Sequence, residues 1–130
     1  WGYATAPFEQ QTKALPNAMF NTSHDNNTLD DRSPAKGPEP ESVTLATFGS
    51  KTYAFIGLER VGGVMVYDIT DPVAATFVTY LNTRTGSTGD LGPEGLTFVA
   101  ADSSPNGKPL LVVANEISGT TAILQINLSY

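Results

Sequence analysis

The stretch GPEPESVTLATFGSKTYAFIGLERVGGVMVYDI, residues 37–69, decides the fold, because GPEGLTFVAADSSPNGKPLLVVANEISGTTAILQI, residues 92–126, repeats its pattern. Glu59 and Glu116 occupy equivalent places, and the two copies align without a gap from these glutamates to their ends. The second copy carries four extra residues, which fit its polar turn at residues 102–108. Strand-rich units that repeat at this length are typical of stacked or radial folds and favour a β-propeller.

Runs rich in β-branched and aromatic residues alternate with Gly, Asp and Pro turns along both copies, which is the pattern of antiparallel strands. The strands predicted in the first copy are residues 42–48, 52–58, 64–69 and 75–81. Those predicted in the second copy are residues 96–100, 110–114 and 121–128. The predicted fold class is all-β: part of a β-propeller with about two four-stranded antiparallel blades plus an irregular N-terminal leader. Helix is expected to be nearly absent, because no long segment has helical apolar spacing free of Gly or Pro.

Three regions are predicted along the chain. Residues 1–36 form a leader and long polar loop that belong to a preceding blade, residues 37–91 form one blade, and residues 92–130 form a second, incomplete blade. Two units do not close a ring, since propellers typically have about 4–8 blades. The chain is therefore expected to be the C-terminal portion of one larger propeller domain. Its expected partners are the remaining blades, from the same protein or another chain.

The composition excludes several classes of function. The net charge is −6, and the 7 Lys and Arg residues are scattered along the chain. Nucleic acid is not predicted as a partner, because phosphate binding needs a clustered basic surface. The chain has no cysteine, which excludes disulfides and thiolate metal sites. No run of about 18 apolar residues occurs, so no transmembrane segment is predicted.

Four glutamates recur in the two copies and are the strongest candidates for chemistry. Glu41 and Glu94 fall just before the first strand of each unit, and Glu59 and Glu116 end the second strand. Carboxylates that recur in a propeller are placed to ring its axis and bind a cation, and Ca²⁺ is the predicted cofactor. The alternative is structural: a glutamate beside a tight turn accepts backbone N–H bonds and holds the repeat together.

The polar loop of the leader supplies a second set of predicted metal ligands, Asp25, Asp30 and Asp31. Their oxygens suit a hard cation such as Ca²⁺, but they lack the D-x-[DN]-x-[DN]-G spacing of an EF-hand loop. Ordinary turn chemistry, with side chains bonded to the backbone, is the alternative. His24 is the only histidine, which excludes zinc sites with several histidines.

Three Asn-x-Ser/Thr sequons are present, at Asn21, Asn26 and Asn127. In a secreted eukaryotic protein they are the predicted glycosylation acceptors. Chance occurrence in a chain rich in Asn, Ser and Thr is the alternative.

No catalytic nucleophile is predicted. The serines lack a G-x-S-x-G elbow, and His24 lies in a loop without a paired base. The glycine-rich run at residues 86–92 lacks the G-K-[ST] ending of a phosphate-binding loop. An enzymatic interpretation would therefore need the glutamates themselves, acting through a bound metal and its water.

Three segments resemble the choice-of-anchor I family: KGPEPESVTL at residues 36–45, TYAFIGLERVGGVMVYDITDP at residues 52–72, and residues 89–126. That family includes bacterial surface proteins, some labelled alkaline-phosphatase-like, and mesenchyme-specific cell-surface glycoproteins of biomineralising animals. The resemblance implies an extracellular β-propeller several times longer than this chain. Where relatives usually have PEPEG, this sequence has Ser42 after Glu41.

The favoured function is an extracellular cell-surface or matrix propeller, a non-enzymatic scaffold with an acidic face for Ca²⁺ or partner binding. Glycans and extracellular matrix are its expected associates. The alternative, implied by the resemblance and by the repeated glutamates, is a metal-dependent phosphoesterase of the alkaline-phosphatase-like kind.

Overall fold

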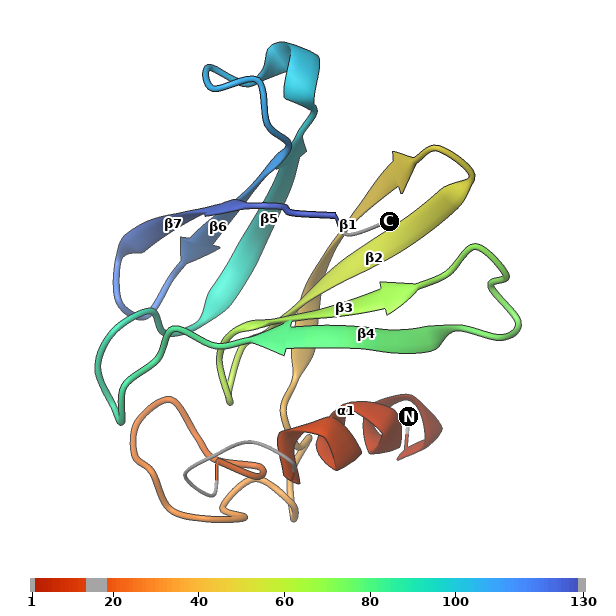
Figure 1. Cartoon of the computed structure of the whole chain (residues 1–130). Coiled ribbons are helices and arrows are strands. Elements are labelled where there is room, and N and C mark those ends of the chain that lie inside the picture. The colour runs from red at the N-terminus through yellow and green to blue at the C-terminus, as the bar shows by residue number, and fades with distance from the viewer. Residues whose placement is uncertain (1, 14–18, 129–130) are drawn as a thin grey trace.

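The computed structural model describes residues 2–13 and 19–128, and it confirms the all-β prediction. Two antiparallel sheets, which we call the first and second blade, follow the chain order of their strands (Figure 1). The first blade contains β1 (Pro40–Phe48), β2 (Lys51–Leu58), β3 (Val64–Asp68) and β4 (Thr76–Leu81). The second blade contains β5 (Pro93–Val99), β6 (Leu110–Asn115) and β7 (Thr120–Gln125). Each observed strand overlaps a predicted one.

The leader departs from the expectation of irregular structure, because it begins with α1 (Gly2–Lys13), a helix of 12 residues. Gly2 and Pro7 both weaken helix propensity, so the local sequence does not predict this helix. Contacts with the first blade stabilise it instead. The Phe8 ring meets the Tyr67 ring edge-on with centroids 5.6 Å apart, and Phe8 packs beside the buried Met65. The prediction that helix is nearly absent is therefore wrong for this segment.

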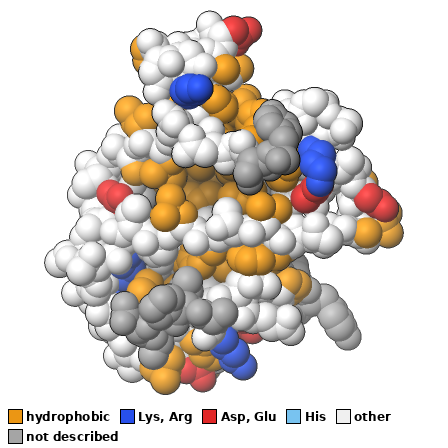
Figure 2. Space-filling view, viewed as in Figure 1, with side chains coloured by type: hydrophobic (Ala, Val, Ile, Leu, Met, Phe, Trp, Pro, Cys, Tyr) orange, Lys and Arg blue, Asp and Glu red, His pale blue; other side chains and the backbone are white. Residues whose placement is uncertain are grey.

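The main core lies between the two blades. Ala46, Phe55 and Val64 of the first blade are buried against Leu111 and Val113 of the second. Alternate residues along each strand point to this core, as the two-residue period of a strand requires. Figure 2 shows further hydrophobic side chains gathered across the middle of the visible face.

Arg84, in the link between the blades, ties the leader to the first blade. Its buried guanidinium donates to the backbone oxygens of Ser23 at 2.6 Å and Asn26 at 2.8 Å. It also donates to the backbone oxygens of Arg60 at 3.1 Å and Val61 at 3.2 Å. Because these acceptors come from segments far apart in the chain, one side chain fixes the polar loop beside the turn after β2.

Candidate cation site

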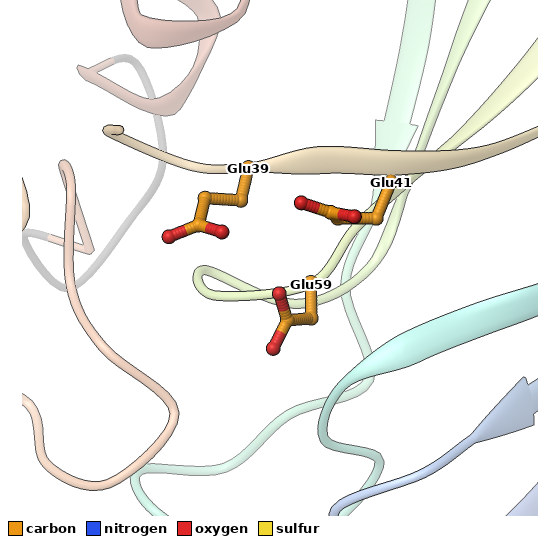
Figure 3. A group of neighbouring side chains, drawn as sticks. All are labelled: Glu39, Glu41 and Glu59. Atoms are coloured by element: carbon orange, nitrogen blue, oxygen red, sulfur yellow. The ribbon is translucent and has the colours of Figure 1, made fainter. Parts of the chain in front are cut away.

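Glutamates of the repeat meet at one end of the first blade. Glu39 and Glu41 project from the start of β1 toward Glu59, which lies directly after β2 (Figure 3). Each of the three offers a carboxylate oxygen, and these oxygens all lie within 4.8 Å of one another. Among residues 2–13 and 19–128, this is the one group of three or more potential metal ligands that comes together in this way.

A β-bulge aims the first glutamate of each copy. In the first blade Pro40 pairs with Leu58 and Ser42 with Gly57, so Glu41 is the extra residue on β1. The second blade has the same irregularity between Pro93 and Gly95, which leaves Glu94 as the extra residue on β5. Bulges turn a side chain away from the regular alternation of a strand. Glu41 and Glu94 thus lie within the first strands, each as the second residue, and not just before them as predicted.

The second glutamate of each copy is fixed by a matching backbone contact. The Glu59 amide donates to the backbone oxygen of Glu39 at 2.8 Å, and the Glu116 amide donates to that of Gly92 at 2.8 Å. Both glutamates therefore emerge at the same point, just after the second strand of their blade. Among the described residues, no backbone N–H donates to either carboxylate, so the structural interpretation of these two side chains finds no support.

In the first blade, basic side chains neutralise Glu39. Its buried carboxylate accepts a hydrogen bond from Arg32 and lies 3.4 Å from Arg60 Nε and 3.5 Å from Lys36 Nζ. Burial acts to raise the pKa of Glu39, but the hydrogen bond from Arg32 and the charges of the three basic residues outweigh it. The pKa of Glu39 is therefore held below its ordinary value, and this carboxylate is already paired.

Arg60 links Glu39 to two further side chains, those of Glu59 and His24. Its Nη2 lies 3.4 Å from Glu59 Oε1, and its Nη1 lies 3.0 Å from His24 Nδ1. One arginine therefore contacts two of the three clustered glutamates. Glu39 and Glu59 are therefore paired with basic residues, Arg60 from the turn after β2 and Arg32 and Lys36 from the leader.

The second blade has no such compensation. Glu116 raises the pKa of Glu94 above its ordinary value of 4.5, through a hydrogen bond that the pair shares when one member is protonated and through its negative charge. Slight burial adds to the shift, followed by the charges of Glu59 and Glu41. Among the described residues, no Lys, Arg or His forms an ion pair with Glu94, Glu116 or Glu41. Glu94 is thus repelled most by Glu116 of its own blade and more weakly by Glu59 and Glu41 of the first blade.

Two exchanges of residues explain this difference between the blades. Arg60 directly follows Glu59, whereas Ile117 directly follows Glu116. Glu39 likewise corresponds to Gly92, and a Cβ placed on Gly92 would lie 2.5 Å from Ile117 Cγ1. In the first blade these two positions hold Glu39 and its basic partner Arg60. In the second blade the Ile117 side chain packs against Gly92 instead.

The leader aspartates do not join this site. Asp25 is exposed and lies 3.1 Å from His24 Nε2, while Asp30 accepts a hydrogen bond from Ser33. Asp31 is exposed as well. Within the described part of the chain these three carboxylates form no group of metal ligands. The loop contains ordinary turn contacts, such as the Asn26 side chain accepting from the Thr28 amide at 2.8 Å.

One predicted glycan acceptor is corrected by the structure. Asn21 is fully buried, and its amide nitrogen donates to Glu9 at 3.2 Å and to Ser33 at 2.7 Å. A sugar on this nitrogen replaces one of its two hydrogens and so breaks at least one of these bonds, and the fully buried side chain leaves it no room, so glycosylation at Asn21 is incompatible with this packing. Asn26 and Asn127 are exposed, and glycosylation at these two sequons stays a prediction.

The basic partners of the site were not predicted from the sequence, and neither was Glu39 as a member of the cluster. Glu39 has no counterpart glutamate in the second copy, so repetition does not single it out. The available signal was its place two residues before Glu41. No sequence pattern connects Arg32 and Arg60 with Glu39, and only the fold brings the three side chains together.

The spacing of the carboxylates suits a hard cation. Ca²⁺ binds oxygens at about 2.3–2.6 Å, so two oxygens on one ion lie at most about 5 Å apart. The oxygens of Glu39, Glu41 and Glu59 meet this limit as they stand, within 4.8 Å. The donors in this cluster are carboxylate oxygens alone, which favours calcium or magnesium over zinc or copper.

Comparison with known proteins identifies the family of this chain. The profile of the choice-of-anchor I domain matches residues 6–72, which is more than half of the chain. The protein belongs to the choice-of-anchor I family, and membership indicates a surface or secreted protein. The resemblance predicted from the sequence is thereby confirmed.

A curated relative extends the comparison into the second blade. Gigasin-3a of Magallana gigas is 30% identical over 112 residues, an alignment that covers 76% of this chain and 39% of that protein. The chain thus spans well under half of that relative's length. No solved structure matches. Among the described residues, no helix is long and apolar enough to cross a membrane.

Proposed function

We propose that the chain forms part of an extracellular, non-enzymatic scaffold that binds Ca²⁺ where the two blades meet. The observation that carries this proposal is the approach of Glu41 and Glu59, whose carboxylate oxygens lie within 4.8 Å of one another, and the repulsion that Glu94 receives from Glu116 and from these two supports it. Glu41 and Glu59 come from the first blade, and Glu94 and Glu116 come from the second. A divalent cation among them would relieve the repulsion at Glu41, Glu94 and Glu116, which form no ion pair with a basic residue in the described part of the chain.

The arrangement favours a weak, reversible site. The carboxylates lie at strand ends and in turns, and Glu41, Glu94 and Glu116 are exposed to solvent. Calcium sites in extracellular modules have dissociation constants of about 10⁻⁴–10⁻³ M, and a solvated site of this kind fits that range. Because its ligands come from both blades, a bound ion would also join them. Glycans at Asn26 and Asn127 and contacts with extracellular matrix complete the proposed setting.

A phosphoesterase is not proposed. Metal-assisted hydrolysis needs a cation with an open position and a cavity that receives the phosphate. A groove lies at the strand ends opposite the clustered glutamates, where Phe48, Phe98 and Ile126 line it.

Calorimetric titration of the chain with Ca²⁺ at neutral pH, together with melting curves, tests the proposal. We expect a heat of binding and a rise in melting temperature, since a ligand at 100 times its dissociation constant stabilises the folded state by about 2.7 kcal/mol. The double variant Glu94→Gln with Glu116→Gln should lose both signals. Absence of heat and of any thermal shift in the unaltered chain would remove the proposal.

A second variant separates the loss of charge from a loss of fold. Ile117→Arg leaves every glutamate in place and supplies the basic partner that Arg60 gives the first blade. It should weaken Ca²⁺ binding while keeping the circular dichroism spectrum. The matched control is Asp102→Asn, which removes one negative charge at η1 (Ala101–Ser103), beyond the far end of β5, and should bind as the unaltered chain does. Equal weakening in the control would mean that net charge, not the site, attracts the cation.

A further inference from the structure

The loop between β5 and β6 is longer than its counterpart in the first blade, because the second copy carries extra residues there. Gly49 and Ser50 alone join β1 to β2, whereas residues 100–109 join β5 to β6. This loop contains η1 and projects beyond the ends of the strands (Figure 1). Asn106 and Gly107 are neighbours within it, and both are exposed. The extra residues thus add a chemical feature, an Asn-Gly pair, that the turn of the first blade does not have.

Two hydrogen bonds hold the Asn106 side chain over the backbone that follows it. Its Oδ1 accepts from the Lys108 amide at 3.0 Å, which is an Asx turn, and from the Ser104 hydroxyl at 2.7 Å. An Asx turn folds the side-chain carbonyl toward the next peptide unit, which is that of Gly107. Both donors draw electrons from the carbonyl and would stabilise the negative charge that develops on Oδ1 when a nucleophile adds to the carbon.

Gly107 supplies an unshielded nucleophile, its own backbone nitrogen. This glycine has a φ of 66°, and a Cβ built on it would meet no atom within 4 Å. No side chain therefore restricts the approach of the nitrogen to the Asn106 carbonyl carbon. The Gly107 amide donates to the backbone oxygen of Ser104 at 3.2 Å, at the long end of the usual range of about 2.7–3.2 Å. A solvent-exposed backbone bond in such a loop opens readily.

We propose that Asn106 is a site of spontaneous deamidation, in which the Gly107 backbone nitrogen attacks the side-chain carbonyl carbon of Asn106. The nitrogen gives up its proton to water and forms a new bond to the carbon, which closes a cyclic succinimide. The bond from that carbon to Nδ2 breaks, and Nδ2 takes up a proton and leaves as ammonia. Water then opens the ring at either carbonyl and yields aspartate or isoaspartate. Water is the only co-reactant.

The reaction would change the loop in two ways. It places a carboxylate, or in the isoaspartate form an extra main-chain carbon, where a neutral amide stands. It also removes a contact between the loop and β7, because Asn106 Nδ2 donates to Gln125 Oε1 at 3.4 Å and a carboxylate cannot donate. The modification therefore acts on the second blade alone, since Gly49 and Ser50 of the first-blade turn contain no amide side chain.

Peptide mapping by mass spectrometry, after incubation of the folded, unglycosylated chain at neutral and mildly alkaline pH, tests the proposal. The peptide that contains Asn106 should gain the mass that separates an acid from an amide and split into aspartate and isoaspartate species. Conversion should be faster at the higher pH, because the attacking nitrogen must lose its proton. Asn26 is the internal control: it is exposed and its Oδ1 accepts from the Thr28 amide at 2.8 Å, but Asn27 follows it. Asn26 should remain unchanged while Asn106 is converted.

A pair of glycine variants separates the chemistry at Asn106 from a general change in the fold. Gly107→Ala shields the attacking nitrogen and should largely abolish conversion. The matched control is Gly49→Ala, which places the same methyl group at a φ of 60° with no atom within 4 Å and should leave conversion of Asn106 unchanged. Circular dichroism verifies that both variants fold. The proposal is overturned if Asn106 keeps its amide, if Asn26 converts equally fast, or if Gly107→Ala converts as the unaltered chain does.

Discussion

The two blades have the same backbone and treat its carboxylates in opposite ways. Glu39 has the left-handed angle φ of 49°, at the place where Gly92 has 72°. Glycine adopts this conformation freely, whereas a glutamate there is strained. The first blade offsets that strain with ion pairs from Arg32 and Arg60, and the second blade avoids it but leaves Glu94 beside Glu116 without a basic partner.

This difference teaches that the repeat controls geometry while individual residues control charge. Matching bulges and matching backbone contacts place the glutamates alike in both blades. The exchange of Arg60 for Ile117 then decides which carboxylates are neutralised. In the first blade Glu39 and Glu59 are paired with basic side chains, whereas Glu94 and Glu116 of the second blade form no ion pair among the described residues.

The largest expected effect comes from removing the side chain that holds the leader against the first blade. Arg84→Met removes the hydrogen bonds from Arg84 to five backbone oxygens and should cost about 3–5 kcal/mol of unfolding free energy. Denaturant melts measure the loss. In hydrogen exchange, amides of the polar leader loop should lose protection well before those of β6, and equal loss in both places would contradict the role of Arg84.

The contact between the blades can be broken at its closest approach. A Cβ on Gly57 would lie 3.0 Å from the Pro93 backbone oxygen and 2.4 Å from the Ser42 hydroxyl. Gly57→Ala should therefore destabilise the chain by about 1–3 kcal/mol through overpacking. The control is Ala114→Gly at the equivalent place in the second blade, which should cost about 0.5–1 kcal/mol for backbone entropy alone. Thermal melts of both variants decide this, and a larger loss in the control would be inconsistent with it.

Glu39→Gln tests the neutralised carboxylate of the first blade. It should lower stability at pH 7 by about 1–3 kcal/mol, because Arg32 and Arg60 lose their charged acceptor. The pKa of Glu39 is depressed, so its contribution is present above the ordinary value of 4.5 and is lost as pH falls through the folded-state pKa. The variant should accordingly lose less stability than the unaltered chain on acidification, and parallel pH profiles would count against the pairing.

Glu94→Gln should act in the opposite direction and more weakly, without added cation. The pKa of Glu94 is raised, so in the folded state its ionised form repels Glu116 at pH 7. The substitution should raise the melting temperature slightly at pH 7. That gain should fade as pH falls through the raised pKa toward 4.5, where Glu94 itself takes up a proton. A fall in melting temperature at pH 7 would mean that the pair is not repulsive.

The sequence alone predicted most of the framework. Strand runs such as residues 52–58 and 110–114, with turns rich in Gly, Asp and Pro, identified the seven strands and their order. The register of Glu59 with Glu116 located both copies of the site. The helix α1 escaped prediction because Gly2 and Pro7 give it no local signal, and its stability comes from contact with the first blade.

What the sequence by itself determined about this protein is therefore its all-β repeat, its family and the recurring glutamates, because side-chain alternation and turn chemistry are local properties. Only the tertiary structure decided that Asn21 is buried, that Arg60 pairs with Glu39, and that Glu39, Glu41 and Glu59 come together. Burial and Coulomb interaction depend on distance in space, and folding sets those distances between residues far apart in the chain.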